Sequence, residues 1–155
     1  SNKNINIKIL LVGPNNFYKK KMINLCKYLN LDKNFIWSDI IVGDLKWGAI
    51  TASSAMVLAS NGENFGVSLV ESMSCSKPVL TTNKVNIYDK ILENDAGYIS
   101  KNNSNDYSKI LEKFYKLKKK DIKSLSNNSL KCFNDNFNLN SRNNNFIKFL
   151  KNQNL

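Results

Sequence analysis

Short apolar runs alternate with amphipathic segments along residues 7–99. The segment 7–12 is largely apolar and ends at Gly13 and Pro14, which is typical of a buried parallel strand followed by a turn. In segment 18–29 the apolar residues recur at helical spacing. We expect further strands at 35–37, 55–58, 78–81 and 97–99, and further helices at 46–52, 65–74 and 87–92. Alternating strands and helices of these lengths predict an α/β domain with a parallel sheet.

The pattern becomes helical throughout from residue 105. Helices are predicted at 107–117, 121–133 and 141–150. We therefore expect a core over 1–104 and C-terminal helices over 105–155 that pack on the same domain. The lysine-rich stretch 113–123 is interpreted as a solvated helix face in preference to a surface that touches an anionic membrane.

The composition is strongly basic, with a formal net charge of +11 over 155 residues. Arg142 is the only arginine, so lysine supplies nearly all of the positive charge, and asparagine is abundant. A protein that reads nucleic acid would use arginine for bidentate contacts, so we favour coding bias over a dedicated polyanion surface and expect no nucleic-acid partner. The positive field would still help to attract a nucleotide sugar.

Cysteine and histidine usage excludes several kinds of site. Cys26, Cys75 and Cys132 are scattered, no C-x-x-C pair occurs, and there is no histidine. A zinc site, a disulfide framework and a histidine-based catalytic triad are therefore not expected, and no metal is expected either. No apolar run approaches the ~20 residues of a membrane-spanning helix. We expect a cytoplasmic protein. Peripheral attachment to the inner face of the membrane is the alternative that we leave open.

Segment 60–71 carries the strongest candidate chemistry. It joins the strand at 55–58 to the helix at 65–74, and it places Glu63 in the loop and Glu71 on the helix. A helix N-terminus favours phosphate, and carboxylates accept hydrogen bonds from sugar hydroxyls. A nucleotide-sugar site needs that combination. The spacing of the two glutamates alone favours the plainer interpretation, in which Glu63 is a solvated loop residue and Glu71 a surface residue of the helix.

The residues around these glutamates carry a family resemblance. Residues 59–80 read Ala-Ser-x-x-Glu-Asn-Phe-Gly-x-x-x-x-Glu-Ser-Met-x-Cys-x-Lys-Pro-Val-Leu. This pattern resembles the donor-binding signature of family 4 retaining glycosyltransferases of the GT-B fold. Further matching segments lie at 10–14, 36–38, 43–49, 84–87 and 96–99, so the resemblance covers about 7–100. It implies a Rossmann-like three-layer domain that binds a UDP- or GDP-sugar, with no cofactor beyond that substrate.

The resemblance assigns roles to individual residues. Glu63 matches the glutamate that contacts the donor sugar near the reacting carbon, and Glu71 matches the one that binds the ribose hydroxyls. The other expected donor-binding residues are Asn64, Phe65, Gly66 and Val67 of the turn, and Gly13, Trp37 and Ile40 at two strand ends. For Phe65 we favour a place in the core, on the inward face of the helix with Leu69, Val70 and Met73, over a contact with the ligand. Trp37 fits a core position at least as well as a nucleobase contact, and Gly13 fits plain turn chemistry equally well.

Parts of the family pattern are expected to be missing. The family's sheet has a first, central strand before the one at 7–12, and the loop after it holds the arginine and lysine that bind the donor diphosphate. Only six residues precede Ile7, so we expect that strand, that loop and the N-terminal acceptor-binding domain to be absent. Strands 9–12 and 55–58 would then flank an open slot with unpaired backbone groups. The sheet closes directly, another chain fills the slot, or the chain is part of a longer polypeptide.

Two functions of different class follow. The first is the donor-binding part of a glycosyltransferase that transfers a sugar to a glycan, polysaccharide precursor or lipid-linked acceptor, and that is inactive as this chain alone. The second is a non-catalytic subunit that binds a partner chain carrying the acceptor domain. Asp39 and Ser76 stand where relatives have glycine, and Asp89-Lys90 where they have glutamate, which keeps the second open. A flavodoxin-like domain would want an acidic cluster at strand ends, which the chain lacks.

Overall fold

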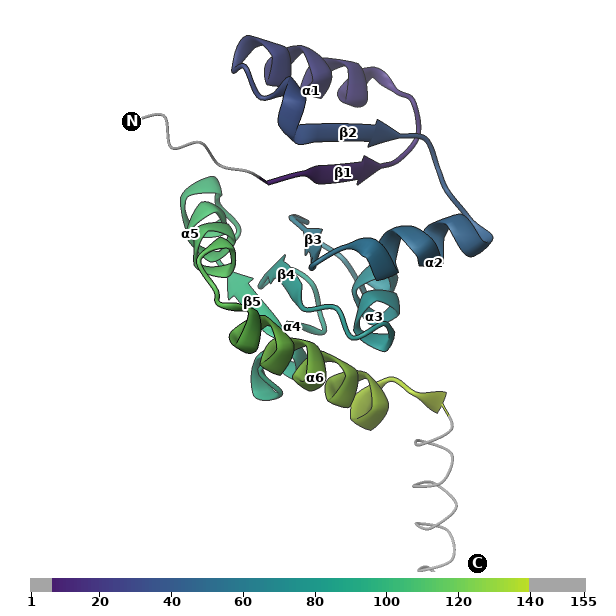
Figure 1. Ribbon diagram of the computed structural model, residues 1–155, viewed down its shortest axis with the longest axis vertical. Coiled ribbons are helices and arrows are strands. Elements are labelled where there is room, and N and C mark those ends of the chain that lie inside the picture. The colour runs from purple at the N-terminus through teal and green to yellow at the C-terminus, as the bar shows by residue number, and fades with distance from the viewer. Residues whose placement is uncertain (1–6, 140–155) are drawn as a thin grey trace, which may run out of the picture. The chain divides into compact units, whose positions relative to one another are not determined.

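The computed structural model describes residues 7–139, and the chain divides into two compact units between Gly48 and Ala49 (Figure 1). We call them the N-terminal unit and the C-terminal unit. The helix α2 (Gly43–Ala52) runs across this division. It begins three residues before the predicted helix at 46–52.

The N-terminal unit is a strand–helix–strand motif. The strand β1 (Ile9–Val12) and the strand β2 (Phe35–Ser38) pair in parallel, in a register that places Ile9 opposite Phe35. The helix α1 (Phe17–Tyr28) and a short 3-10 turn, η1 (Asp32–Asn34), connect them.

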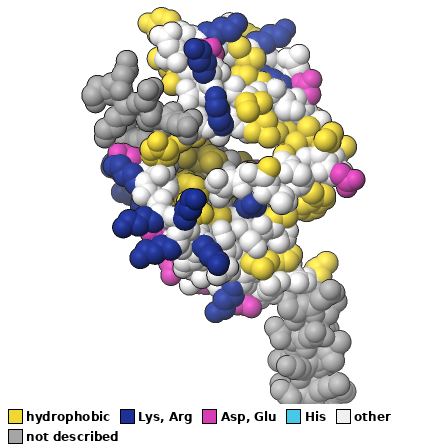
Figure 2. Space-filling model, in the orientation of Figure 1, with side chains coloured by type: hydrophobic (Ala, Val, Ile, Leu, Met, Phe, Trp, Pro, Cys, Tyr) yellow, Lys and Arg dark blue, Asp and Glu magenta, His cyan; other side chains and the backbone are white. Residues whose placement is uncertain are grey.

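The prediction that β1 is buried is wrong. Its pairing is parallel as expected, but Leu10 is 44% exposed and Val12 46%. β1 has β2 as its partner, and Cys26 is the one buried hydrophobic residue that the structure describes in this unit. Yellow hydrophobic side chains are accordingly visible on the surface over this unit (Figure 2).

The C-terminal unit contains a second sheet of three parallel strands. They are β3 (Met56–Leu58), β4 (Val79–Thr82) and β5 (Gly97–Ser100), in that order. Met56 lies opposite Val79, and Val79 opposite Gly97. The connecting helices are α3 (Val67–Ser74) and α4 (Tyr88–Glu93). The sheet is followed by α5 (Ser104–Tyr115) and α6 (Lys119–Asn136).

Helices cover both faces of this second sheet. Leu69 and Met73 of α3 and Ile91 of α4 form the core with Val79 of β4, and α6 packs outside α3 and α4 (Figure 1). The opposite face is covered by α5, where the Tyr107 hydroxyl donates to the Leu80 carbonyl at 2.9 Å. Side chains alternate between faces along a strand, which is why Val79 belongs to the core cluster with α3 and α4 while its equally buried neighbour Leu80 does not. The α/β class with parallel strands is confirmed.

The ends of several helices differ from the predicted ones because of local caps. Helix α3 begins at Val67 rather than at 65, since Gly66 precedes it in a left-handed conformation. Helix α5 begins at Ser104 rather than at 107, since the Asn103 side chain accepts from the Asp106 N–H at 2.8 Å. The predicted helix at 141–150 lies outside the described residues.

The strands form two separate hydrogen-bonded sheets within residues 7–139. β1 pairs with β2 in the N-terminal unit, and β3 pairs with β4 in the C-terminal unit. No helix in the described part of the chain combines the length and the apolar character needed to span a bilayer.

Candidate functional site

The loop between β3 and α3 is tied to the loop after β4. Glu63 and Val85 form an isolated parallel bridge, in which the Glu63 N–H donates to the Lys84 carbonyl and the Asn86 N–H donates to the Glu63 carbonyl, both at 3.1 Å. The Glu63 side chain is exposed. The carboxylate is thus carried on a fixed backbone at the carboxyl edge of the second sheet, where folds of this kind bind ligands.

Gly66 has a conformation and an environment that other residues fit poorly. Its φ is +64° and its ψ 54°, and its carbonyl accepts from the N–H groups of Leu69 at 2.8 Å and Val70 at 3.3 Å. A Cβ at this position would lie 3.0 Å from Cγ1 of the buried Val85. The glycine therefore fixes both the start of α3 and its approach to the loop after β4. The first N–H groups of a helix have no partner within it, so α3 begins at Val67, shortly after Glu63 in the chain, with donors that the helix itself does not use.

Glu71 lies one turn further along than Val67, on the half-buried surface of α3. The same helix buries Leu69, Val70 and Met73, as predicted. Glu63 and Glu71 thus come from one loop-and-helix segment of the C-terminal unit.

Phe65 does not point into the core as predicted. It is 46% exposed, and its ring packs edge-on against the ring of Phe137, with centroids 5.8 Å apart. The reason is that Phe65 precedes the left-handed Gly66 and is not part of the inner face of α3. Its neighbours Asn64 and Val67 are also exposed.

The remaining predicted residues belong to the N-terminal unit. Gly13 follows β1, where it donates from its N–H to the Ser38 carbonyl at 3.2 Å. Trp37 is half-buried and stacks on Phe35 with ring centroids 5.8 Å apart, which favours the structural role that we left open for it. Ile40 is 66% exposed.

Lys19 organises this edge, and the sequence analysis missed it. Its ammonium donates to the carbonyls of Ser38 at 2.9 Å and Gly13 at 3.3 Å, and it pairs with the Asp39 carboxylate at 2.8 Å. It therefore binds together the carboxyl ends of β1 and β2. The sequence did contain a sign of this role. Lys19 lies in the first turn of the helix that follows β1, and that turn begins at the carboxyl edge of the sheet.

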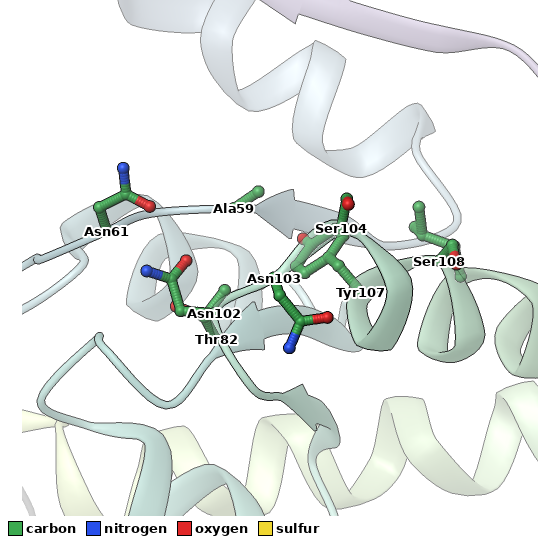
Figure 3. Close-up of a pocket in the computed structure, with 9 residues that line it drawn as sticks. Ala59, Asn61, Thr82, Asn102, Asn103, Ser104, Tyr107 and Ser108 are labelled. Atoms are coloured by element: carbon green, nitrogen blue, oxygen red, sulfur yellow. The ribbon is translucent and has the colours of Figure 1, made fainter.

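A pocket of about 400 Å³ lies at the carboxyl ends of β3, β4 and β5 (Figure 3). The lining comes from the loops after β3 and β5, from the end of β4 and from α5, and none of its residues is charged. Its lining residues are Ala59, Asn61, Thr82, Asn102, Asn103, Ser104, Tyr107, Ser108 and Leu111. None of the predicted site residues lines it. The sequence indicates only a loop at residues 102–105 and gives no sign that this loop borders a pocket.

Two buried groups keep their protons at neutral pH. Burial raises the pKa of the Tyr107 phenol to about 12 and that of the Cys132 thiol to about 11. Neither group is a nucleophile or a general base near pH 7. Within residues 7–139, no group of three or more histidine, cysteine, aspartate or glutamate side chains could hold a metal ion.

Comparisons with known proteins point to sugar transfer. A family model described as "Glycosyl transferases group 1" matches residues 1–131. HepE of Anabaena, solved in complex with UDP, is similar in structure with a TM-score of 0.78 at 18% sequence identity, over 94% of this chain and 41% of that one. Sucrose-phosphate synthase from Thermosynechococcus elongatus has a TM-score of 0.75 at 17% identity, over 94% of this chain and 38% of the other.

A third solved structure is itself a C-terminal domain. The C-terminal domain of the group 1 family protein LpcC from Francisella tularensis has a TM-score of 0.67 at 22% identity, over 79% of this chain and 63% of that one. No curated protein matches the sequence. The chain spans about a third of WaaG and about two fifths of HepE.

Proposed function

The chain belongs to the group 1 glycosyl transferases, and we propose that it binds the nucleotide-sugar donor of a retaining, family 4 sugar transfer. The observation that carries this proposal is the segment from Glu63 to Glu71. It holds two carboxylates around the start of α3, and the backbone bridge to Val85 fixes the first of them. The UDP-bound state of the similar HepE structure supports UDP as the first nucleotide to test.

Each part of this segment has a task in the proposed site. Glu71 accepts hydrogen bonds from the ribose hydroxyls, and Glu63 accepts them from the donor sugar. The turn at Gly66 and the first N–H groups of α3 face the diphosphate, whose negative charge a helix start favours.

The transfer replaces one bond at the anomeric carbon by another. The bond from that carbon to the diphosphate breaks, and the nucleoside diphosphate leaves with the bonding electron pair. The acceptor hydroxyl oxygen bonds to the same carbon and gives up its proton to the leaving phosphate. Glu63 stabilises the positive charge that develops on the sugar ring as the first bond breaks. A glycan or lipid-linked acceptor binds outside the described residues, so we expect no turnover by this chain alone.

A second candidate function is association with another chain that supplies the acceptor domain. The observation that favours it is the exposure of β1, an apolar strand that pairs with β2 alone among the described residues. Exposed apolar strands of this kind are normally covered. The two candidates are compatible, and nucleotide binding separates them.

The test is calorimetric titration of the purified chain with UDP and with GDP, beside the variant Glu71→Ala. A matched control is Glu112→Ala, which removes an exposed glutamate from α5. We expect binding of one nucleotide by the native chain, a loss of tenfold or more in Glu71→Ala, and no change in Glu112→Ala. A folded native chain that binds neither nucleotide at millimolar concentration would contradict the proposal, and so would equal binding by Glu71→Ala.

A further inference from the structure

Hydrogen bonds hold both the N–H and the carbonyl of Lys84. Its N–H donates to the Thr82 hydroxyl at 3.3 Å, and that hydroxyl donates to the Ser60 carbonyl at 2.6 Å. Its carbonyl accepts from the Glu63 N–H at 3.1 Å. The next residue, Val85, is fully buried. The position of the Lys84 Cα is therefore fixed relative to the loop that carries Glu63.

The Lys84 side chain itself is exposed and forms no ion pair with any residue that the structure describes. This distinguishes it from several other lysines of the C-terminal unit. Lys90 pairs with Glu93, Lys109 with Asp106, and Lys116 with Glu112. Lys84 thus combines a rigid backbone with an ammonium group that is available to a ligand.

Glu63 and Lys84 present opposite charges from adjacent positions of the same bridge. Glu63 lies opposite Val85, so Lys84 is the neighbour of its bridge partner, yet the two charged groups are not within the 4.0 Å of an ion pair. Val85 is fully buried, whereas the side chains of Lys84 and Glu63 are both exposed. A ligand that carries hydroxyls next to an anion matches this pair. In a nucleotide sugar the phosphate is attached directly to the sugar ring, so it offers that arrangement.

We propose that Lys84 binds the sugar-linked phosphate of the donor and positions it beside Glu63. This inference rests on the proposed function. An ammonium group forms charge-assisted hydrogen bonds with phosphate oxygens, and these are stronger than bonds between neutral groups. During transfer the same ammonium stabilises the negative charge that accumulates on the departing diphosphate.

The experiment compares UDP with uridine, which lacks the phosphates. Titrations are done on the native chain, on Lys84→Gln, and on Lys84→Arg, which keeps the charge. We expect Lys84→Gln to weaken UDP binding about tenfold while uridine affinity stays the same, because only UDP presents phosphate. Lys84→Arg should retain most of the UDP affinity. Circular dichroism melting of each variant checks that the fold is intact.

The matched control is Lys119→Gln, which removes the same charge from the start of α6. The other end of α6 leads to Phe137, whose ring contacts Phe65 of the candidate loop. At 1.5 Å per helical residue, Lys119 is on the order of 25 Å from that end, beyond the range of unscreened charge at physiological salt. We expect Lys119→Gln to bind UDP as the native chain does.

The outcomes separate this inference from the function on which it rests. A native chain that binds neither UDP nor uridine overturns the proposed function. A native chain that binds UDP, with equal affinity in Lys84→Gln, overturns the role of Lys84 alone. An equal loss in Lys84→Gln and Lys119→Gln shows a general effect of net charge and also contradicts the role. Loss of uridine binding together with UDP binding in Lys84→Gln assigns the residue to the fold of the loop instead.

Discussion

The two units have the same local pattern of parallel strands and helices, but they differ in how much of it they bury. In the C-terminal unit Leu69, Met73 and Ile91 are 0% exposed. In the N-terminal unit the only buried hydrophobic residue within the described part is Cys26, at 4%. A strand pattern therefore predicts pairing better than it predicts burial, since burial needs elements on both faces of the sheet.

The number of elements in each unit explains the difference. A sheet of three strands with α3 and α4 on one face and α5 on the other encloses its apolar side chains from both sides. The pair β1 and β2 has the single helix α1 between its strands. One helix cannot cover two faces, so Leu10 and Val12 stay accessible.

The largest expected effect tests whether stability resides in the C-terminal core. We expect Leu69→Ala to lower the free energy of unfolding by about 3 kcal/mol, because it removes a fully buried side chain and leaves a cavity. The same change at the half-exposed Leu10 should cost less than about 1 kcal/mol. Urea unfolding followed by circular dichroism measures both values. Equal losses of unfolding free energy in the two variants would contradict the view that stability resides in the C-terminal core.

The two tryptophans sharpen that measurement. Trp37 lies on β2, and Trp47 lies on α2, the helix that crosses the division, so in a Trp47→Phe background the fluorescence of Trp37 reports on the N-terminal unit. If the units unfold independently, Leu69→Ala shifts the circular dichroism transition and leaves the fluorescence transition in place. A joint shift of both transitions would mean that the C-terminal core stabilises the whole chain.

A smaller effect is expected at Gly66, whose backbone is left-handed and whose surroundings leave little room for a side chain. Gly66→Ala should lower the free energy of unfolding by about 1–2 kcal/mol, because a left-handed conformation is costly for other residues. The new methyl group also meets Val85 at 3.0 Å. The control is Gly62→Ala, where a Cβ has nothing within 4 Å and φ is not positive. We expect the control to change stability by less than about 0.5 kcal/mol.

The Gly66 variant also reports on the candidate site. UDP titration of Gly66→Ala under folding conditions should show weaker binding than Gly62→Ala, because the start of α3 must move away from Val85. Undiminished UDP affinity in a stably folded Gly66→Ala protein would mean that this turn does not contact the donor.

Local sequence patterns predicted most of the elements and failed where long-range contacts decide. The predicted strands agree with the observed ones to within a few residues because each is a short apolar run, and glycine or proline lies at an end of β1, β4 and β5. Two helices begin at other residues than predicted because of their caps at Asn103 and Gly66. One side chain or one φ angle decides where a helix begins. The exposure of Phe65 and the role of Lys19 could not be predicted. Each depends on a partner more than 15 residues away, Phe137 in one case and the carbonyl of Ser38 in the other.

The smallest expected effect tests what holds the N-terminal unit together in place of a core. Lys19→Met removes the ammonium that bridges the carbonyls of Gly13 and Ser38, while it keeps the length of the side chain. We expect a loss of about 1 kcal/mol in the fluorescence-detected transition, the typical worth of such hydrogen bonds. Asp39→Asn breaks only the ion pair, and since the carboxylate is 75% exposed the loss should stay below about 0.5 kcal/mol. A larger loss in Asp39→Asn than in Lys19→Met would show that the ion pair, and not the bridging of the two strand ends, stabilises this unit.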